Sequence, residues 1–397
     1  MTKPSINQYW KTILSIVVLS ALGACGGESS DSEDSTAPVI TLIGEQEVRI
    51  LINDTFTDLG ANANDDIDGI VAVTTSGTVD TSIKGVYTLT YTAIDSSGNE
   101  ATLTRSILVD NPKPFITTWK TNNPGDTADH QIKIQTHSGT QYNYTVNWGD
   151  GNIDEDVTTD ITHDYAEAGT YTISISKDFP RIFFSGYECY KLLTVEQWGE
   201  AEWTSMANAF EDCNSLQINT EDTPNLKSVT TMTAAFHNAR EFNGNLSNWD
   251  VSSVTDMSYM FQEASIFDGD LSKWNVSNVE NMNSIFNRAA AFNADISNWD
   301  VSKVSDMDYM FLDATIFNRD VSSWDVSSVT KMLEMFDNSS LSTDNYDSLL
   351  ISWSQQQLQS NVTFGANSTQ YTSAASAARS TLDTTFSWSI TDAGQKP

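Results

Sequence analysis

The sequence predicts a mainly β fold with short helices, in which two small β-sandwiches precede a solenoid of 25-residue repeat units with a C-terminal α/β cap. Three observations predict it. Residues 37–180 contain short runs in which apolar and polar residues alternate, separated by turn clusters rich in Gly, Asp and Asn. Residues 185–340 repeat Met, Phe and Trp every 25 positions. The period is lost in residues 341–397.

Composition limits the function. The chain has 397 residues, of which 39% are apolar, and a net charge of −33 from 53 acidic and 20 basic side chains. This length and apolar content correspond to several folded domains. We expect no nucleic-acid partner, because binding one requires a basic face that displaces counterions. With four histidines and three cysteines, the composition favours an exported binding or scaffold protein over an enzyme.

Residues 1–24 predict a secretion signal. Lys3 and Lys11 precede an apolar run at 13–22, which is too short to span the roughly 30 Å hydrocarbon core of a membrane as a helix. The run leads into Leu-Gly-Ala-Cys at 22–25, which resembles the lipobox of bacterial lipoproteins. An ordinary cleaved signal followed by an incidental cysteine is the alternative.

The lipobox resemblance implies that Cys25 is diacylated and anchors the mature protein in a membrane. Two or three acyl chains form a stable anchor, because each buried methylene contributes about 0.8 kcal/mol. Gly26 rather than Asp follows the cysteine, which in such lipoproteins implies the outer membrane or the cell surface. Residues 25–36 are rich in Gly, Ser and acidic side chains, so we expect a solvated, flexible tether.

The first sandwich is predicted for residues 37–110. Alternating runs at 39–42, 48–50, 71–73 and 86–91 indicate about seven short strands. Gly-Val-Tyr at the start of the last run resembles a tyrosine corner, and the segment as a whole resembles the Ig-like modules of bacterial surface proteins.

Four aspartates in two turns of this sandwich are candidate metal ligands. Asp65, Asp66, Asp68 and Asp95 offer carboxylate oxygens, and Ca²⁺ takes six to eight oxygen ligands. Calcium is therefore a candidate cofactor. The alternative is that these residues are present because aspartate suits tight turns.

The second sandwich is predicted for residues 115–180. It contains Trp-Gly-Asp-Gly at 148–151, His-Asp-Tyr at 163–165 and Gly-Thr-Tyr at 169–171. These motifs, in this order, resemble the polycystic-kidney-disease (PKD) type of Ig-like domain, which serves as a spacer or as a contact for proteins and glycans. His163 and Asp150 could form an acid–base pair, but no nucleophile is spaced to join them, so we expect a structural role.

Residues 185–340 are predicted to stack as units that share one interior. A Phe recurs in steps of 25 or 26 residues, and a Met precedes each Phe by four positions. The two columns are Phe210, Phe236, Phe261, Phe286, Phe311 and Phe336, and Met206, Met232, Met257, Met282, Met307 and Met332. A unit that cannot bury its own apolar face is stable only when it is stacked on its neighbours.

Within one unit, Leu271, Trp274 and Val276 have the L-x-x-L-x-L spacing of a leucine-rich repeat, which predicts one short strand per coil. The units FDGDLSKWNVSNVENMNSIF and FNADISNWDVSKVSDMDYMF closely resemble the BspA-like leucine-rich repeats of bacterial surface antigens. The resemblance implies a surface-exposed, non-catalytic protein that binds host or matrix components. We expect the Trp column to be interior. An exposed platform that stacks on sugars is the alternative.

The residues between the interior positions are expected to face solvent on a concave sheet. One column contains Asp250, Asn275, Asp300 and Asp325, and a second contains Asp270, Asp295 and Asp320. Strands stack about 4.8 Å apart, so like charges in a column repel one another. We expect counterions, bound Ca²⁺ or hydrogen bonds between Asn and neighbouring carbonyls to offset this repulsion.

Cys189 and Cys213 are predicted to form a disulfide. They are 24 residues apart, close to one repeat, so they fall on adjacent coils within reach of each other. Export takes the chain to an oxidising compartment. The alternative is two small buried residues in the interior.

Residues 341–397 are predicted to cap the stack, because the last coil needs a cover for its exposed interior. We expect helices at 344–353 and 374–382 and strands at 361–365 and 386–391.

The sequence contains no HExxH, GxSxG or Walker motif in a suitable setting, so we predict that the chain is not an enzyme. The leading hypothesis is a lipid-anchored surface protein whose two Ig-like modules present a repeat scaffold to an extracellular protein or polysaccharide. A glycan-binding accessory lipoprotein and a purely structural envelope protein are the alternatives.

Overall fold

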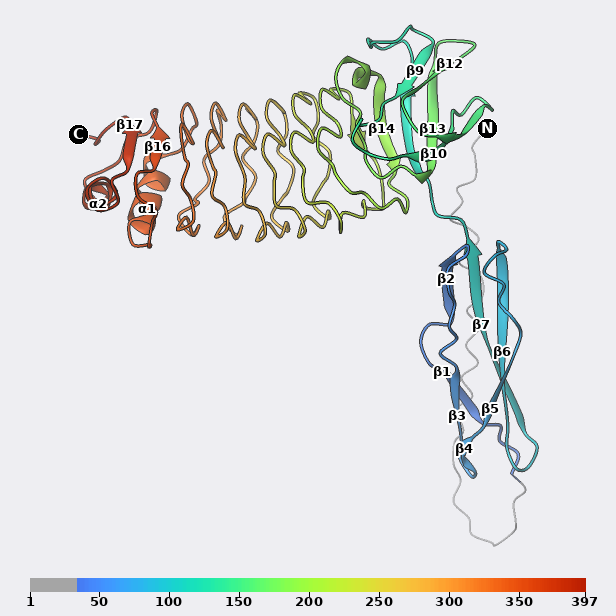
Figure 1. The fold of residues 1–397 in the computed structure, drawn as a ribbon. Coiled ribbons are helices and arrows are strands. Elements are labelled where there is room, and N and C mark those ends of the chain that lie inside the picture. The colour runs from blue at the N-terminus through green and yellow to red at the C-terminus, as the bar shows by residue number, and fades with distance from the viewer. Residues whose placement is uncertain (1–33) are drawn as a thin grey trace, which may run out of the picture. The chain divides into compact units, whose positions relative to one another are not determined.

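The computed structural model describes residues 34–397 (Figure 1). These residues form a mainly β fold with several sheets and a few short helices. The fold divides into two compact units after Asp110. Within the described residues, no helix is both long enough and apolar enough to cross a bilayer.

The first unit is a sandwich of two sheets. Its strands are β1 (Val39–Leu42), β2 (Glu47–Leu51), β3 (Ala61–Asp65), β4 (Gly69–Val71), β5 (Val73–Ser76), β6 (Gly85–Ile94) and β7 (Glu100–Asp110). One sheet has the order β1-β3-β4 and the other has the order β2-β7-β6-β5. Leu89, Tyr91 and Ala93 of β6 are buried because alternate residues of a strand face the same side. The Tyr87 hydroxyl donates to the Ile83 carbonyl at 2.8 Å, which confirms the predicted tyrosine corner.

The second unit begins with a strand-rich segment that continues into the repeats. Its strands are β8 (Phe115–Lys120), β9 (Gln131–Ile134), β10 (Asn143–Asn147), β11 (Ile153–Val157), β12 (Ile161–Asp164) and β13 (Thr170–Asp178), followed by β14 (Leu192–Gln197) and β15 (Gln217–Ile218). A short helical turn, η2 (Tyr187–Lys191), precedes β14. Because β14 pairs with β8, one sheet of order β11-β10-β13-β8-β14-β15 joins this segment to the first coils. A single hydrophobic core runs from Phe115 to Trp388.

Between β15 and α1 (Thr343–Trp353) the chain winds into coils that lie side by side along the second unit (Figure 1). Single parallel bridges join the coils in one row, which contains Thr231, Asp256, Asn281, Asp306 and Lys331. The strand expected at 271–276 is wrong. That segment forms turns, in which the Trp274 N–H donates to the Leu271 carbonyl at 3.1 Å.

Each coil contains two left-handed residues in the segment that follows its Met. In the coil that contains Met257, the φ angles of Tyr259 and Glu263 are 59° and 60°, and the same two positions are left-handed in the neighbouring coils. The N–H groups of Met257, Tyr259, Phe261 and Glu263 all donate to carbonyls of the following coil, at 2.8 to 3.0 Å. Each coil therefore directs these donors forward and the matching acceptors backward along the stack.

Aromatic rings fill the interior of the coils. Phe236, Phe261, Phe286 and Phe311 form a continuous stack with centroids 5.6 to 5.8 Å apart and planes within 10° of parallel. The four tryptophans of the repeats, Trp249, Trp274, Trp299 and Trp324, are at most 5% exposed. The prediction that they are interior is confirmed, and the alternative of a tryptophan platform for sugars is wrong.

The C-terminal segment covers the last coil. It consists of α1, β16 (Thr363–Ala366), α2 (Ser376–Phe386) and β17 (Ser389–Asp392), so the two predicted helices and two predicted strands are confirmed with small shifts in their boundaries. Ser342 begins α1 by accepting a hydrogen bond from the Asn345 N–H. The Phe336 N–H of the last coil donates to the Gly365 carbonyl at 2.9 Å. The forward-pointing donors of the last coil thus find an acceptor in β16.

Candidate binding surface

The seven side chains expected at the surface of the coils are all exposed, but they lie on turns and not on a sheet. The first column is Asp250, Asn275, Asp300 and Asp325, and the second is Asp270, Asp295 and Asp320. Each accepts a hydrogen bond on its own side-chain oxygen from the backbone N–H of the serine two residues later, at 2.9 to 3.2 Å. The expected concave sheet is therefore wrong, and a series of identical Asx turns takes its place.

Hydrogen bonds within these turns also stabilise the charged form of the aspartates. Hydrogen bonds from Ser252 and Ser302 lower the pKa of Asp250 and of Asp300. Ser272 does the same for the pKa of Asp270. These serine bonds were not among the expected sources of compensation. A bond of the expected kind, from Asn to a neighbouring carbonyl, joins the Asn298 side-chain amide to the Ser272 carbonyl at 2.7 Å. The columns are exposed edges of the coils.

An inter-coil ladder of amides and carboxylates was missed by the sequence reasoning. The Oδ1 atom of Asn243 accepts from the N–H of Asp268 at 3.0 Å, Asp268 accepts from Asn293 at 2.8 Å, and Asn293 accepts from Asn318 at 3.0 Å. The signal was available, because Phe also recurs every 25 residues in a second column and an Asn or Asp follows each of its members, which are Phe242, Phe267, Phe292 and Phe317. This ladder fixes the spacing of the coils on one face.

A second missed feature is a row of alternating charge. Glu263 pairs with Arg240 at 2.9 Å and with Arg288 at 3.2 Å, and Arg288 also lies 3.4 Å from a carboxylate oxygen of Asp313. These residues come from consecutive coils. Glu263, Arg288 and Asp313 are the second left-handed residues of their coils, and Arg240 lies two residues after the corresponding Asn238. The row therefore presents both signs of charge to solvent, unlike the acidic columns.

Two tyrosines interrupt the polar surface. Tyr259 is 40% exposed, and Tyr309 occupies the same position two coils further on, with the buried Ser284 between them. Both have a left-handed backbone, with φ of 59° and 60°, a conformation that is unfavourable for a bulky side chain. Exposed aromatic rings held on a rigid backbone are a typical contact for ligands.

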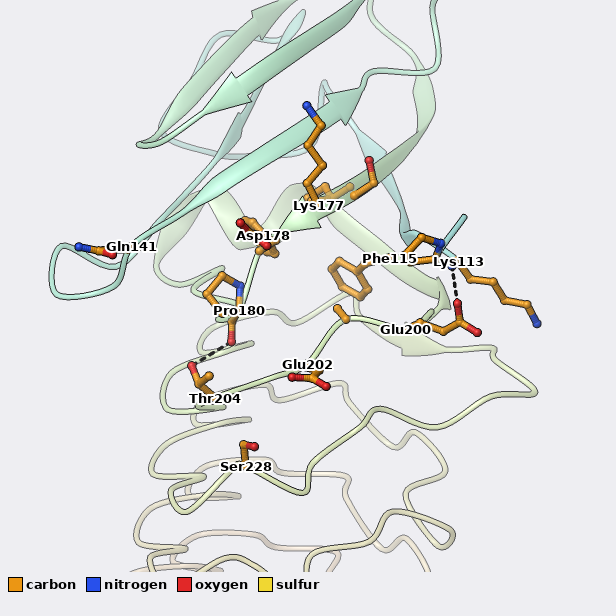
Figure 2. A pocket seen from close by; sticks show the side chains of 15 residues that line it. Lys113, Phe115, Gln141, Lys177, Asp178, Pro180, Glu200, Glu202, Thr204 and Ser228 are labelled. Carbon is orange, nitrogen blue, oxygen red and sulfur yellow. Dashed lines mark hydrogen bonds between the residues drawn. The ribbon is translucent and has the colours of Figure 1, made fainter. Parts of the chain in front are cut away.

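A hollow of about 580 Å³ lies where the six-stranded sheet meets the first coils (Figure 2). Phe115 lies in its wall, and charged groups of both signs surround it, among them Lys113, Lys177 and Glu202. The Lys113 N–H donates to a carboxylate oxygen of Glu200 at 2.8 Å, which ties the start of β8 to the chain after β14. The lining thus combines apolar side chains with charged groups of both signs.

The remaining predicted site residues have different positions. Cys25 lies outside the described residues. Cys189 and Cys213 form a disulfide between η2 and the first coil, with Cα atoms 4.8 Å apart. The His163 ring lies 2.8 Å from Asp150 and stacks on the Trp148 ring. The pair is therefore packed into the strand-rich segment that begins the second unit.

The four aspartates of the first sandwich all lie near one end of it. Asp68 accepts from the N–H of Ser96 at 2.6 Å, so the turn after β3 contacts the turn after β6. Asp95 accepts from the N–H and the side-chain amide of Asn99, both at 2.8 Å. Asp66 points instead to the Thr36 hydroxyl, at 2.6 Å.

Two families match parts of the chain. The family described as "Bacterial surface protein, Ig-like domain" matches residues 40–109. The family described as "Mycoplasma protein of unknown function, DUF285" matches residues 204–298 and 270–376, which include the coils and part of the cap. The first unit is therefore an Ig-like domain of the kind found in bacterial surface proteins. No curated protein matches the chain.

Solved structures show only distant similarity. A lipoprotein from Bacteroides thetaiotaomicron is 19% identical, with 34% of this chain and 60% of that chain covered and a TM-score of 0.18. A structure of Clostridium perfringens ZmpB with the CBM51-2 domain in complex with GlcNAc is 16% identical, with 35% and 44% covered and a TM-score of 0.17. The chain thus spans less than two thirds of either protein, and these TM-scores support no inference about function.

Proposed function

We propose that this chain is a lipid-anchored bacterial surface protein whose stacked coils bind an extracellular protein. In this proposal the coils are a leucine-rich-repeat-type solenoid of the BspA-like kind, and the segment at 115–180 is a PKD-type spacer. The anchor is Cys25, and the protein lies on the outer membrane or the cell surface. The proposal assigns no catalytic activity to the chain.

The observation that carries this proposal is that each coil has one set of repeated residues in the core and another set at the surface. The Phe and Trp columns are buried and repeat with fixed spacing, so they are committed to the core. The outer positions repeat with the same spacing and place acidic turns, mixed charges and two tyrosines in parallel rows. A rigid surface with rows of similar groups suits a large partner, because it offers many weak contacts in register.

The acidic columns indicate the chemistry of that partner. Their carboxylates are exposed and ionised, and the whole chain has a net charge of −33. A complementary surface would be basic, and its association would be faster at low ionic strength. We therefore infer a partner with a basic face.

Binding of the full chain to a panel of purified matrix proteins and polysaccharides tests the proposal. A variant with Asp250→Asn, Asp300→Asn and Asp325→Asn keeps the turn acceptors but removes three charges, and we expect it to lose most of the affinity for a basic protein. Asp80→Asn in the Ig-like unit is the matched control, because Asp80 also accepts from the serine two residues later. Equal binding by all three proteins would contradict the proposal.

A glycan-binding accessory role is the second candidate, and the tyrosines favour it. Tyr259 and Tyr309 recur two coils apart, and an aromatic ring is a stacking surface for a sugar. The Phe stack advances 5.7 and 5.8 Å per coil, so the two tyrosines are about two such steps apart. This candidate predicts that the double variant Tyr259→Ser, Tyr309→Ser loses retention on a polysaccharide array. The control is the variant Ile266→Ser on the same array, because Ile266 is an exposed apolar residue of another row.

A further inference from the structure

Three carboxylates from separate segments of the Ig-like unit converge. One oxygen from each of Asp34, Asp68 and Asp95 lies within 4.8 Å of the other two. Asp34 precedes β1, Asp68 belongs to the turn between β3 and β4, and Asp95 follows β6. The convergence therefore joins the start of the described chain to two turns of the sandwich.

Neutral donors hold these three segments in place. Asn99 donates its side-chain amide to Asp95 at 2.8 Å and to the Asp34 carbonyl at 3.1 Å. Ser96 donates its hydroxyl to Asp68 at 2.9 Å. The carboxylates are thus ordered before any ligand arrives, although these bonds alone do not indicate one.

Asp65 supplies an independent observation. Its side chain is only 3% exposed, and its Oδ1 atom accepts from the N–H groups of Ile67 and Asp68, both at 2.9 Å. Its Oδ2 atom is buried without a hydrogen-bond donor. Because its Oδ1 atom accepts from the backbone of Asp68, the Asp65 carboxylate is fixed to the turn that contains Asp68.

The same deficiency occurs in Asp34, whose Oδ2 atom is also buried without a donor. Among the described residues, the carboxylate oxygens that are buried and unpaired belong to these two aspartates alone. A buried oxygen without a donor costs about 1 to 3 kcal/mol, and more when it is charged. Asp34 and Asp65 belong to the same end of the Ig-like unit, so one ligand bound there could supply a partner to each Oδ2 atom.

The local charge indicates what that ligand is. None of the ion pairs that join described residues involves Asp34, Asp65, Asp68 or Asp95. Carboxylates this close repel one another strongly in a partly buried site. A cation with a preference for several oxygen ligands offsets both the repulsion and the missing donors.

We propose that this end of the Ig-like unit binds Ca²⁺ through Asp34, Asp68 and Asp95, with Asp65 as a buried fourth carboxylate. Calcium suits the site better than magnesium, because it accepts many oxygens in flexible geometry whereas Mg²⁺ demands a near-ideal octahedron. The membership differs from that expected from the sequence. Asp34 enters, and Asp66 is engaged by the Thr36 hydroxyl.

Calcium at this site would also fix the tether. Asp34 is part of the acidic segment at 25–36, so a bound ion would pin the end of that segment to the sandwich. The proposal does not depend on what the coils bind.

Calorimetric titration of chelator-treated full-length protein with CaCl₂ tests the site. We expect binding at one site with a dissociation constant typical of extracellular modules, about 10⁻⁴ to 10⁻³ M. Asp68→Asn and Asp34→Asn should each weaken it at least tenfold. Asp80→Asn should not, because the ten residues of β6 separate Asp80 from Asp95, roughly 30 Å. Equal affinity for Mg²⁺, or unchanged binding by Asp34→Asn, would overturn the proposal.

Limited proteolysis gives a readout that does not depend on calorimetry. Calcium should slow cleavage of the tether in the natural protein and leave the cleavage rate of Asp34→Asn unchanged. Asp34 lies at the edge of the fold, so its substitution should leave near-UV circular dichroism intact. If calcium protects both proteins equally, the ion binds elsewhere, and loss of binding in the triple variant of the coils would identify the acidic columns as its site.

Discussion

The indole Nε1 of Trp299 donates a hydrogen bond to the carbonyl oxygen of Leu271 on the preceding coil, at 3.2 Å. Trp274 and Trp324 make the equivalent bond to Leu246 and Ile296. The tryptophan therefore has two roles, because its ring fills the interior and its one polar atom satisfies a buried carbonyl of the neighbouring coil. Each coil is bonded to the next through both backbone and side chain.

Replacing Trp299 with Phe should destabilise the stack. Phe retains most of the apolar ring but removes one of the two hydrogen bonds that the Leu271 carbonyl accepts, the other coming from the Trp274 N–H. A hydrogen bond of this kind contributes about 0.5 to 1.5 kcal/mol. Urea unfolding followed by far-UV circular dichroism measures the change. Lys273→Ala, at an exposed position of the same row of turns, should change stability by less than about 0.5 kcal/mol. Similar midpoints for the two variants would contradict this assignment.

The pKa values of two histidines should be shifted in opposite directions. The hydrogen bond that the His237 ring donates to the Glu211 carboxylate, at 3.0 Å, raises the pKa of His237 above its usual value of 6.5. Burial, helped by the nearby Arg181, lowers the pKa of His137 below the same value. Proton NMR titration of the ring signals, assigned with His237→Gln and His137→Gln, measures both. A His137 signal that titrates at the higher pH would contradict the environments described here.

The His237 pair should also give stability a pH optimum. The raised pKa of His237 means that its contribution is complete below about pH 6.5 and is lost as pH rises through the folded value. The hydrogen bond from His237 lowers the pKa of Glu211, so that contribution is complete above about pH 4.5 and is lost on acidification. Urea midpoints should therefore fall between pH 6 and pH 8 by more in the natural protein than in His237→Gln. Parallel profiles would show that the pair is not coupled to folding.

Removing the disulfide should loosen the junction between the sandwich and the coils. The bond closes a loop of 24 residues, for which the chain-entropy estimate is about 3 kcal/mol. The double variant Cys189→Ser, Cys213→Ser should unfold at lower urea concentration and become insensitive to reductant. Intact mass after alkylation provides the check: modification of both cysteines in non-reduced, unfolded protein would mean that the bond does not form.

Gly365→Ala should detach the cap from the last coil. A Cβ atom there would lie 2.5 Å from the Glu334 Cα, so the strand must move. Overpacking of this kind typically costs about 1 to 3 kcal/mol. We expect faster proteolysis after residue 340 and little change in the Ig-like unit. Thr363→Ala, on the exposed side of β16, is the control.

The sequence was sufficient for much of the interior. Phe286 and Trp299 were expected inside because their columns repeat every 25 residues, and they are buried. The helix at α1 was expected from its apolar period. These features depend on burial alone, which an apolar pattern reports directly.

The backbone of the coils could not be predicted in the same way. The spacing of Leu271, Trp274 and Val276 is the same whether the segment is a strand or a pair of turns, since both place these side chains inside. The difference lies in backbone bonds such as that from the Trp274 N–H to the Leu271 carbonyl, and the spacing of apolar side chains does not report such bonds. The strand was therefore expected in the wrong place.

The candidate calcium site shows a different limit. Asp65, Asp68 and Asp95 drew attention because they lie in recognisable turns. Asp34 did not, because it looked like one more acid of the tether, and its contact with Asn99 spans 65 residues. A ligand set built from distant segments requires the folded topology before it can be found.

The forward direction of the coil donors has a consequence for how such a protein changes length. Every internal coil receives and offers the same set of bonds, so an added or deleted 25-residue unit would meet matching partners on both sides. Neither the sandwich end nor the cap would need new residues. Duplication of a short stretch of gene could therefore change the number of coils without a fresh solution to their folding.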